Sequence, residues 1–249
     1  VTRETFARIA DHCIQHYFSQ ANYWKIEGHP YFSFYELNKL MEGFGSLKAA
    51  RAALDDFRER ARRAGHPDLH LNAVVWNSPF LPGESSPSDP AKVIEALGFD
   101  SVTSYVWIHH YTTEQFPAVS YETIKEAYFA HWKETAKKFT VPYLPNVTMG
   151  WDSSPRTTQT DRFDPLGYPF MYTVAENTPE AFGTALAQSL SQLQKQSDGP
   201  RFLTINAWNE WTEGSYLEPD TKNGMAYLEA IHAAKARLSR VTEYAGEKA

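Results

Sequence analysis

Phe202-Leu-Thr-Ile-Asn-Ala-Trp-Asn-Glu-Trp-Thr-Glu-Gly-Ser215 is the stretch of this sequence that says most about its fold. In the two-residue period of a β-strand, one face carries the apolar side chains of Leu203, Ile205 and Ala207. The opposite face carries the side chains of Thr204, Asn206, Trp208 and Glu210. An apolar face that packs on helices, backed by amide, indole and carboxylate groups, is typical of a barrel strand that ends at an active site.

A second glutamate, Glu213, follows this strand. Residues three apart in an extended chain point to opposite faces, so Glu210 and Glu213 converge only if the chain turns after Trp211. Thr212 and Gly214 permit such a turn. Because two carboxylates near one site can divide acid and base roles, we predict Glu210 and Glu213 as a catalytic pair.

Apolar, β-rich runs alternate with amphipathic segments along the rest of the chain. Strands are predicted near 31–36, 69–77, 101–107, 143–151 and 202–211. Helices are predicted near 46–64, 89–97, 120–139, 178–196 and 224–239, after an opening helix from Thr2 to about Gln20. The N-cap candidates are Ser46, Asp89, Ser120 and Thr178, and the helix stops are Gly65 and Gly98. This alternation predicts an α/β fold with a parallel sheet, and polar strand ends favour a (βα)8 TIM-type barrel.

The strand count is short of a closed barrel, because about five strands are found where a barrel has eight. The simplest account places the first strands in an upstream segment that completes the barrel, which would leave the first and last strands here with open edges. No linker divides residues 1–249, so we expect a single barrel domain. Two long loops, Asn77–Ser88 and Asp152–Asn177, follow strands and are expected at the C-terminal face.

Tryptophans gather at the predicted strand ends. Five of the seven lie at or just past such an end: Trp76, Trp107, Trp151, Trp208 and Trp211. An indole ring has a broad apolar face and one donor edge, which suits the C–H face of a sugar. Tryptophans also fill barrel cores, but their clustering at one end favours a carbohydrate site.

Further candidates for substrate binding lie at the same strand ends: Glu36, His109, His110, Asp152, Arg156, Asn206 and Asn209. Arg156 has two open interpretations, since it can bind a sugar hydroxyl or an anionic group, or it can pair with Asp152 and rigidify the loop. Glu36 is equally open between binding and a structural ion pair. Adjacent histidines point apart in an extended chain and make a poor metal pair.

Composition and motifs exclude several classes of function. A net charge of −6 without a basic run argues against a nucleic-acid surface, and the segment from Arg58 to Arg63 reads as a solvated helix face. Glycine-rich phosphate loops and Gly-x-Ser-x-Gly are absent, and no cofactor is expected. His12 and His16 lack the carboxylate of a zinc helix motif, so no metal is predicted.

Cysteine usage and apolar runs bear on the compartment. Cys13 is the one cysteine of the chain, which excludes an internal disulfide framework. No apolar run reaches the roughly 18 residues of a membrane span, and the N-terminus lacks the order of a signal peptide. The expectation is a cytosolic protein, or an exported one whose targeting segment has been removed.

The segment Asn206–Asp220, followed by Gly224–Ala230, resembles the WbsX-like domains of polysaccharide gene clusters. These domains are described as glycoside hydrolase family 99-like, after the endo-α-1,2-mannosidases. Three other stretches agree with the resemblance: Pro30–Glu36, Ser101–Trp107 and Gly150–Arg156. The resemblance is most specific in Asn-Glu-Trp-x-Glu-Gly and covers most of the chain.

The resemblance implies a (βα)8 barrel in which this motif lies on the last strand, so the five strands here would be the fourth to eighth. It implies that Glu210 acts as a base on the sugar 2-hydroxyl, giving an anhydro-sugar intermediate. Glu213 would be the general acid/base, with retention. Thr212 stands where the mannosidases usually have histidine, which weakens the case for mannose.

We therefore expect a retaining glycoside hydrolase that cleaves an α-linked, mannose-like oligosaccharide or polysaccharide. Two other interpretations stay open at this point. One is a glycosyltransferase of surface polysaccharide (O-antigen type) biosynthesis, although the residues show no diphosphate site. The other is a catalytically silent carbohydrate-binding barrel, which would bind oligosaccharide without turnover.

Overall fold

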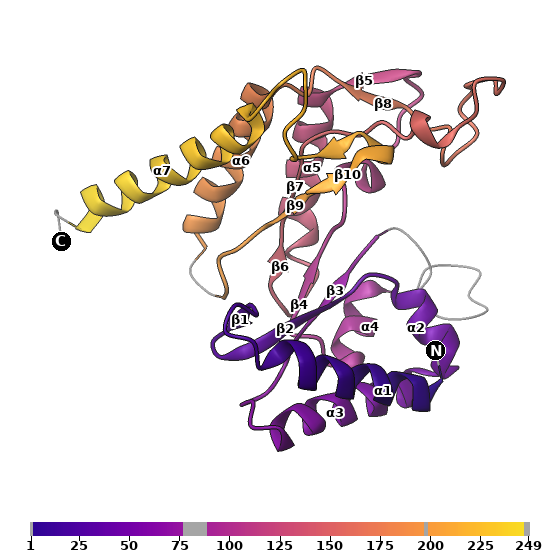
Figure 1. The fold of residues 1–249 in the computed structure, drawn as a ribbon, viewed down its shortest axis with the longest axis vertical. Coiled ribbons are helices and arrows are strands. Elements are labelled where there is room, and N and C mark those ends of the chain that lie inside the picture. Colours follow the sequence, from indigo (N-terminus) through magenta and orange to yellow (C-terminus); the bar gives the residue numbers. More distant parts are fainter. Residues whose placement is uncertain (1, 77–88, 197–198, 247–249) are drawn as a thin grey trace. The chain divides into compact units, whose positions relative to one another are not determined.

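The computed structural model describes residues 2–76, 89–196 and 199–246 (Figure 1). The predicted loop Asn77–Ser88 lies outside the described residues. The chain divides into two compact units: unit 1 comprises residues 1–104 and 134–143, and unit 2 comprises residues 105–133 and 144–249.

The sheet of unit 1 is built on three parallel strands, β2 (His29–Phe34), β3 (His70–Val74) and β4 (Ser101–Thr103). Beyond β4 the sheet continues to β6 (Tyr143–Leu144). On the outer side, β1 (Lys25–Ile26) pairs antiparallel with the start of β2. This pairing covers His29 and Pro30, which lie just before the predicted strand range 31–36, so the open edge stays a prediction for that range.

Four helices pack in unit 1: α1 (Arg3–Cys13), α2 (Leu37–Phe44), α3 (Leu47–Arg63) and α4 (Pro90–Leu97). A π-helical turn, η1 (Ile14–Phe18), extends α1. The other three helices all contact α3 (Figure 1). The hydroxyl of Ser46 caps α3 and the carboxylate of Asp89 caps α4, as predicted. Phe57 of α3 joins the helices through ring contacts with Phe6 and Phe18, both at 5.9 Å between centroids.

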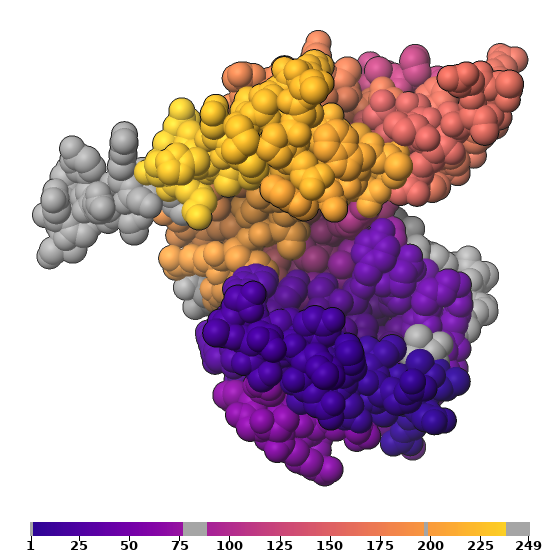
Figure 2. Space-filling model, viewed as in Figure 1, coloured from indigo at the N-terminus to yellow at the C-terminus, as the bar shows by residue number. Residues whose placement is uncertain are grey.

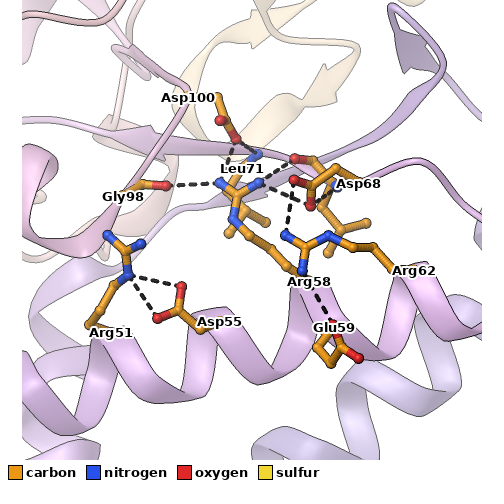
Figure 3. A network of polar contacts seen from close by, with 10 residues as sticks. Arg51, Asp55, Arg58, Glu59, Arg62, Asp68, Leu71, Gly98 and Asp100 are labelled. Carbon is orange, nitrogen blue, oxygen red and sulfur yellow. Dashed lines mark hydrogen bonds and ion pairs between the residues drawn. The ribbon is translucent and has the colours of Figure 1, made fainter.

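Arg58 lies at the centre of a polar network that ties α3 to β3 and to the turn before β4 (Figure 3). The residue is only 9% exposed. Its guanidinium donates to the carbonyls of Leu69 (2.6 Å) and Gly98 (2.8 Å) and to the carboxylate of Asp100 (2.7 Å). The same Asp100 oxygen accepts the backbone N–H of Leu71 at 2.7 Å. The prediction of a solvated face from Arg58 to Arg63 is therefore wrong for Arg58, because its charge is buried and paired.

Unit 2 contains two parallel strand pairs, β7 (Asn146–Thr148) with β9 (Thr204–Asn206) and β5 (Ala118–Ser120) with β8 (Thr173–Ala175). A short hairpin joins β10 (Asn209–Glu210) to β11 (Ser215–Tyr216). The helices are α5 (Tyr121–Thr135), whose last two residues belong to unit 1, α6 (Pro179–Gln194) and α7 (Ala226–Gly246). Helices α6 and α7 lie side by side (Figure 1), with Gly183 against Ala230.

Each of the five predicted strand ranges contains a strand, and each predicted helix is present, so the α/β class with parallel pairing is confirmed. The strands are shorter than predicted, and the range 143–151 is divided between β6 and β7. The segment Asp152–Asn177 is partly regular, since it contains the 3-10 helix η3 (Ser154–Arg156) and β8. The single barrel domain over 1–249 stays a prediction.

We predict that Arg58→Met lowers the free energy of unfolding by about 2–4 kcal/mol, because two buried carbonyls and a partly buried carboxylate lose their donor. Urea denaturation measures this change. Arg63→Met is the matched control, since its side chain is 73% exposed and, among the described residues, pairs with Glu59 alone; it should cost less than about 1 kcal/mol. Equal effects of the two substitutions would contradict the structural role of Arg58.

Candidate active site

The turn after β10 brings the two glutamates of the motif together. The 3-10 helix η4 (Trp211–Glu213) reverses the chain, and Gly214 follows in the left-handed region at φ +58°. The predicted turn after Trp211 is confirmed. The backbone N–H of Asp152 donates to the carbonyl of Glu213 at 2.7 Å, which holds the turn against the loop that follows β7.

Arg156 contacts both glutamates from η3, which lies against η4. Its Nη2 is 2.9 Å from Oε1 of Glu210 and 3.5 Å from Oε1 of Glu213. Thr212 also donates its hydroxyl to Oε1 of Glu210 at 3.0 Å. The predicted alternative in which Arg156 pairs with Asp152 is not observed, because the Asp152 carboxylate accepts the N–H of Ser154 instead. The loop containing Arg156 and the segment of the two glutamates both belong to unit 2. Figure 2 colours the first salmon and the second orange.

The two glutamates occupy different environments. The Glu213 side chain is 10% exposed and the Glu210 side chain is 36% exposed. Both oxygens of Glu213 accept a phenol hydroxyl, from Tyr168 at 3.1 Å and from Tyr105 at 3.2 Å. Desolvation, and then the bond to Glu213, raise the pKa of Tyr168, so its hydroxyl keeps its proton. A buried and a half-exposed carboxylate side by side can take different roles in catalysis.

Trp208 and Trp211 provide exposed aromatic surface beside this pair, at 54% and 44% exposure. The Trp211 ring stacks on Tyr216 with 3.7 Å between centroids and 16° between planes. Its indole N–H donates to Glu218 at 2.6 Å. The ring of Trp211 is therefore held in one orientation, as a stacking platform requires.

The other two tryptophans of unit 2 that were predicted as sugar platforms are buried. Trp107 is fully buried in the 3-10 helix η2 (Trp107–His110), and its N–H donates to the carbonyl of Asn146. The prediction for Trp107 is therefore wrong, because its ring packs between aromatic side chains of α5 and exposes no face. Trp151 is 2% exposed, and its ring contacts Tyr168, so it supports a residue that binds Glu213.

The two predicted histidines differ in their surroundings. His109 lies between Tyr105 and Trp151, with centroids at 6.0 and 6.4 Å, and burial lowers its pKa to about 4. His110 instead stacks on His131 of α5 at 4.2 Å. Burial, followed by the proximity of His131 and His109, lowers the pKa of His110 to about 3. Both rings are therefore neutral at pH 7, and only His109 adjoins the residues around Glu213.

Four other residues predicted to bind substrate are divided between the two units. Asn206 ends β9, is 2% exposed, and accepts the Ser215 hydroxyl at 2.5 Å, whereas Asn209 lies exposed in β10. Glu36 and Trp76 belong to unit 1: Glu36 immediately precedes α2, and Trp76 follows β3. Their roles in substrate binding stay predictions.

Tyr168 is the residue of this site that the sequence does not single out. It lies in a loop without hydrophobic periodicity, more than forty positions before Glu213, and no motif surrounds it. Only tertiary contact shows its role. Tyr105 is easier to find, since it belongs to the polar aromatic run after β4.

Within 2–76, 89–196 and 199–246, no group of three or more His, Cys, Asp or Glu side chains is placed to hold a metal ion. None of the helices in the described part of the chain combines the length and apolar composition of a membrane span.

Comparison with known protein families identifies the family of this chain. The family model described as Glycosyltransferase WbsX matches residues 3–231. The chain belongs to this WbsX family. Its members are carbohydrate-active proteins, as the predicted resemblance implies. The WxcX proteins of two strains of Xanthomonas campestris pv. campestris, B100 and ATCC 33913, are each 34% identical over 117 residues, covering 44% of this chain. This match spans only 15% of the length of each WxcX protein.

Solved structures give the fold of this WbsX-family chain. A glycoside hydrolase-like protein superposes with a TM-score of 0.59 at 15% identity, covering 93% of this chain and 60% of its own. A GH99 endo-alpha-mannosidase from Bacteroides thetaiotaomicron superposes with a TM-score of 0.56 at 14% identity, covering 98% and 68%. The chain therefore has a GH99-like α/β fold, of the TIM-barrel type, and spans about two thirds of these structures.

We predict that Gly214→Ala destabilises the site more than Gly224→Ala does. Both glycines have nearly the same positive φ, +58° and +56°, so both substitutions carry a similar backbone strain. A Cβ at Gly214 would also lie 2.8 Å from Cβ of Asp152, whereas Gly224 has open space. The extra cost at Gly214 should be about 1–3 kcal/mol, measured by thermal or urea unfolding. Equal costs would show that the contact with Asp152 is not tight.

We predict that His110 contributes acid sensitivity to stability. Its folded pKa of about 3 lies below its ordinary value, so the unfolded chain takes up a proton first as the pH falls. The stability it provides is full above about pH 6.5 and falls by about 2 kcal/mol by pH 5. His110→Phe should therefore lose less unfolding free energy between pH 7 and pH 5 than the wild type. His16→Gln, at an exposed position, should behave like the wild type.

Proposed function

We propose that this WbsX-family protein is a retaining glycoside hydrolase that acts on an α-linked polysaccharide through Glu210 and Glu213. The observation that carries the proposal is the convergence of both carboxylates on one guanidinium. Glycosidic cleavage needs an acid for the departing oxygen and a base on the anomeric side. A buried glutamate next to a half-exposed one offers both groups.

The spacing of the two glutamates supports retention. Their Oε1 atoms lie 2.9 and 3.5 Å from the same Arg156 nitrogen. The two carboxylates bind the same nitrogen and therefore lie close together, and a closer carboxyl pair distinguishes retaining from inverting enzymes. A close pair leaves little room for a water molecule between carboxylate and sugar, and it agrees with the route that the family resemblance implies. In that route Glu210 removes the proton of the 2-hydroxyl, whose oxygen attacks the anomeric carbon.

The surroundings of Glu213 suit a group that loses and regains a proton. In the first step it would protonate the departing oxygen while the glycosidic bond breaks, and in the second it would take a proton from water. A phenol hydroxyl can donate or accept. Tyr105 and Tyr168 can therefore hold Glu213 as carboxylate or as carboxylic acid, without moving its oxygens.

A glycosyltransferase is the second candidate, and the description of the matching family favours it. Transfer from a nucleotide sugar needs a site for the diphosphate. In the described residues around Glu210 and Glu213, Arg156 is the cation in contact, and it is already paired with both carboxylates. The site geometry therefore supports hydrolysis better. A catalytically silent carbohydrate-binding protein remains the third interpretation and predicts binding without turnover.

We predict that Glu213→Gln and Glu210→Gln each lower kcat on α-mannan or bacterial surface polysaccharide by about 10²–10⁴-fold, because an acid–base group contributes that much. Release of reducing ends measures the reaction. Glu114→Gln, an exposed residue of unit 2, is the matched control and should keep wild-type activity. Thermal unfolding of all variants separates lost chemistry from lost structure.

Three outcomes distinguish the candidates. Turnover that disappears in Glu213→Gln supports the hydrolase. Equal turnover in wild type and Glu213→Gln would overturn the assignment of Glu213. Consumption of a nucleotide sugar by the wild type, without release of reducing ends, would favour the transferase.

A further inference from the structure

A pocket of about 390 Å³ lies in unit 2 beside the catalytic segment, and the proposed reaction does not use it. Its walls include Trp151, Asp152, Glu176, Asn177, Tyr216 and Lys222. The volume is in the lower part of the range of small-molecule sites, roughly 300–1,000 Å³. The pocket is therefore large enough for a small ligand.

The pocket adjoins the catalytic turn directly. Asp152 and Gly214 both line it, and the Asp152 N–H binds the carbonyl of Glu213. Tyr216 also lines it, and the ring of Tyr216 stacks on Trp211. An extended ligand that lies over Trp211 would therefore reach the pocket by passing the stacked rings of Trp211 and Tyr216.

Two charged residues in the wall have no side-chain partner among the described residues. Neither Lys222 Nζ nor the Glu176 carboxylate makes a hydrogen bond or ion pair there. Glu176 also has φ +62°, a conformation that costs a non-glycine residue about 1 kcal/mol or more and that occurs often at ligand sites. Both groups are thus free to bind a ligand.

The chemistry of the wall selects the class of ligand. Asp152 and Glu176 outnumber Lys222, so an anionic group such as a diphosphate is disfavoured. A carboxylate accepts hydrogen bonds from hydroxyl groups and an ammonium donates them, whereas the side-chain amide of Asn177 already donates to the carbonyl of Met149 at 3.2 Å. Tyr216 is the partly exposed aromatic residue of the wall, and an aromatic ring suits the C–H face of a pyranose. The combination fits an uncharged, polyhydroxylated ring.

We infer that this pocket is a subsite for a further neutral sugar unit of the polysaccharide chain, held by Lys222 and Glu176 beyond the unit at which cleavage occurs. The inference rests on the proposed function, because it assumes that a carbohydrate chain reaches Glu210 and Glu213. The subsite predicts that the affinity of the protein for an oligosaccharide increases with the number of sugar units. Only a longer oligosaccharide reaches from Glu210 and Glu213 into the pocket.

The test measures binding in a Glu213→Gln background by calorimetric titration with α-linked manno-oligosaccharides of two to six units. An oligosaccharide digest of any polysaccharide that the wild type cleaves is titrated in parallel. Adding Lys222→Ala and Glu176→Gln should weaken binding of the longest chains about tenfold and leave the disaccharide unchanged. The matched control adds Lys133→Ala and Glu114→Gln, two exposed positions of unit 2, and should change neither.

The outcomes separate the inference from the proposed function. Wild-type turnover combined with unchanged length dependence in the pocket variant overturns the subsite and leaves the hydrolase standing. Length-dependent binding that the pocket variant loses, without turnover by the wild type, supports the subsite and overturns the hydrolase. Absence of binding to every probe overturns the subsite. If the pocket variant and the matched control unfold at the same temperature, misfolding is excluded as the cause of weaker binding.

Discussion

The ion pair of Arg156 with two glutamates is the interaction on which the candidate site depends. Two carboxylates that face one space repel each other, and a guanidinium between them offsets that repulsion. Arg156 comes from a loop that the backbone hydrogen bond between Asp152 and Glu213 joins to the turn after β10. Gly214 permits that bond, because a side chain there would meet Asp152. Loop and turn therefore form one rigid arrangement around the pair.

Within this arrangement the protein makes two identical side chains unequal. Glu213 is enclosed and bound by two phenols, whereas Glu210 is open to solvent and bound by Arg156 and Thr212. Hydrolysis and glycosyl transfer both need an acid or base next to an anomeric carbon, so the difference alone does not decide between them. The proximity of the two carboxylates, and the pairing of Arg156 with both of them, are the observations that the proposal of hydrolysis uses.

In unit 1 a guanidinium, that of Arg58, is buried, and a buried charge must be paired. Burial of the Arg58 guanidinium costs little because two carbonyls and a carboxylate accept its hydrogen bonds. Trp107 in unit 2 follows the same rule, with its N–H bound to a backbone carbonyl. In both cases the buried N–H groups donate hydrogen bonds to acceptors in the interior. Neither placement follows from the local pattern, which for Arg58 is that of an exposed helix face.

The sequence by itself determined the alternation of strands and helices, the helix caps at Ser46 and Asp89, and the turn that brings Glu210 toward Glu213. These features are local, so the two- and 3.6-residue periods, cap chemistry and glycine predict them. Tertiary structure alone decided that Tyr168 binds Glu213 and that Trp107 is buried. Such contacts join residues tens of positions apart, and whether a side chain meets solvent, core or catalytic group depends on which segments pack together.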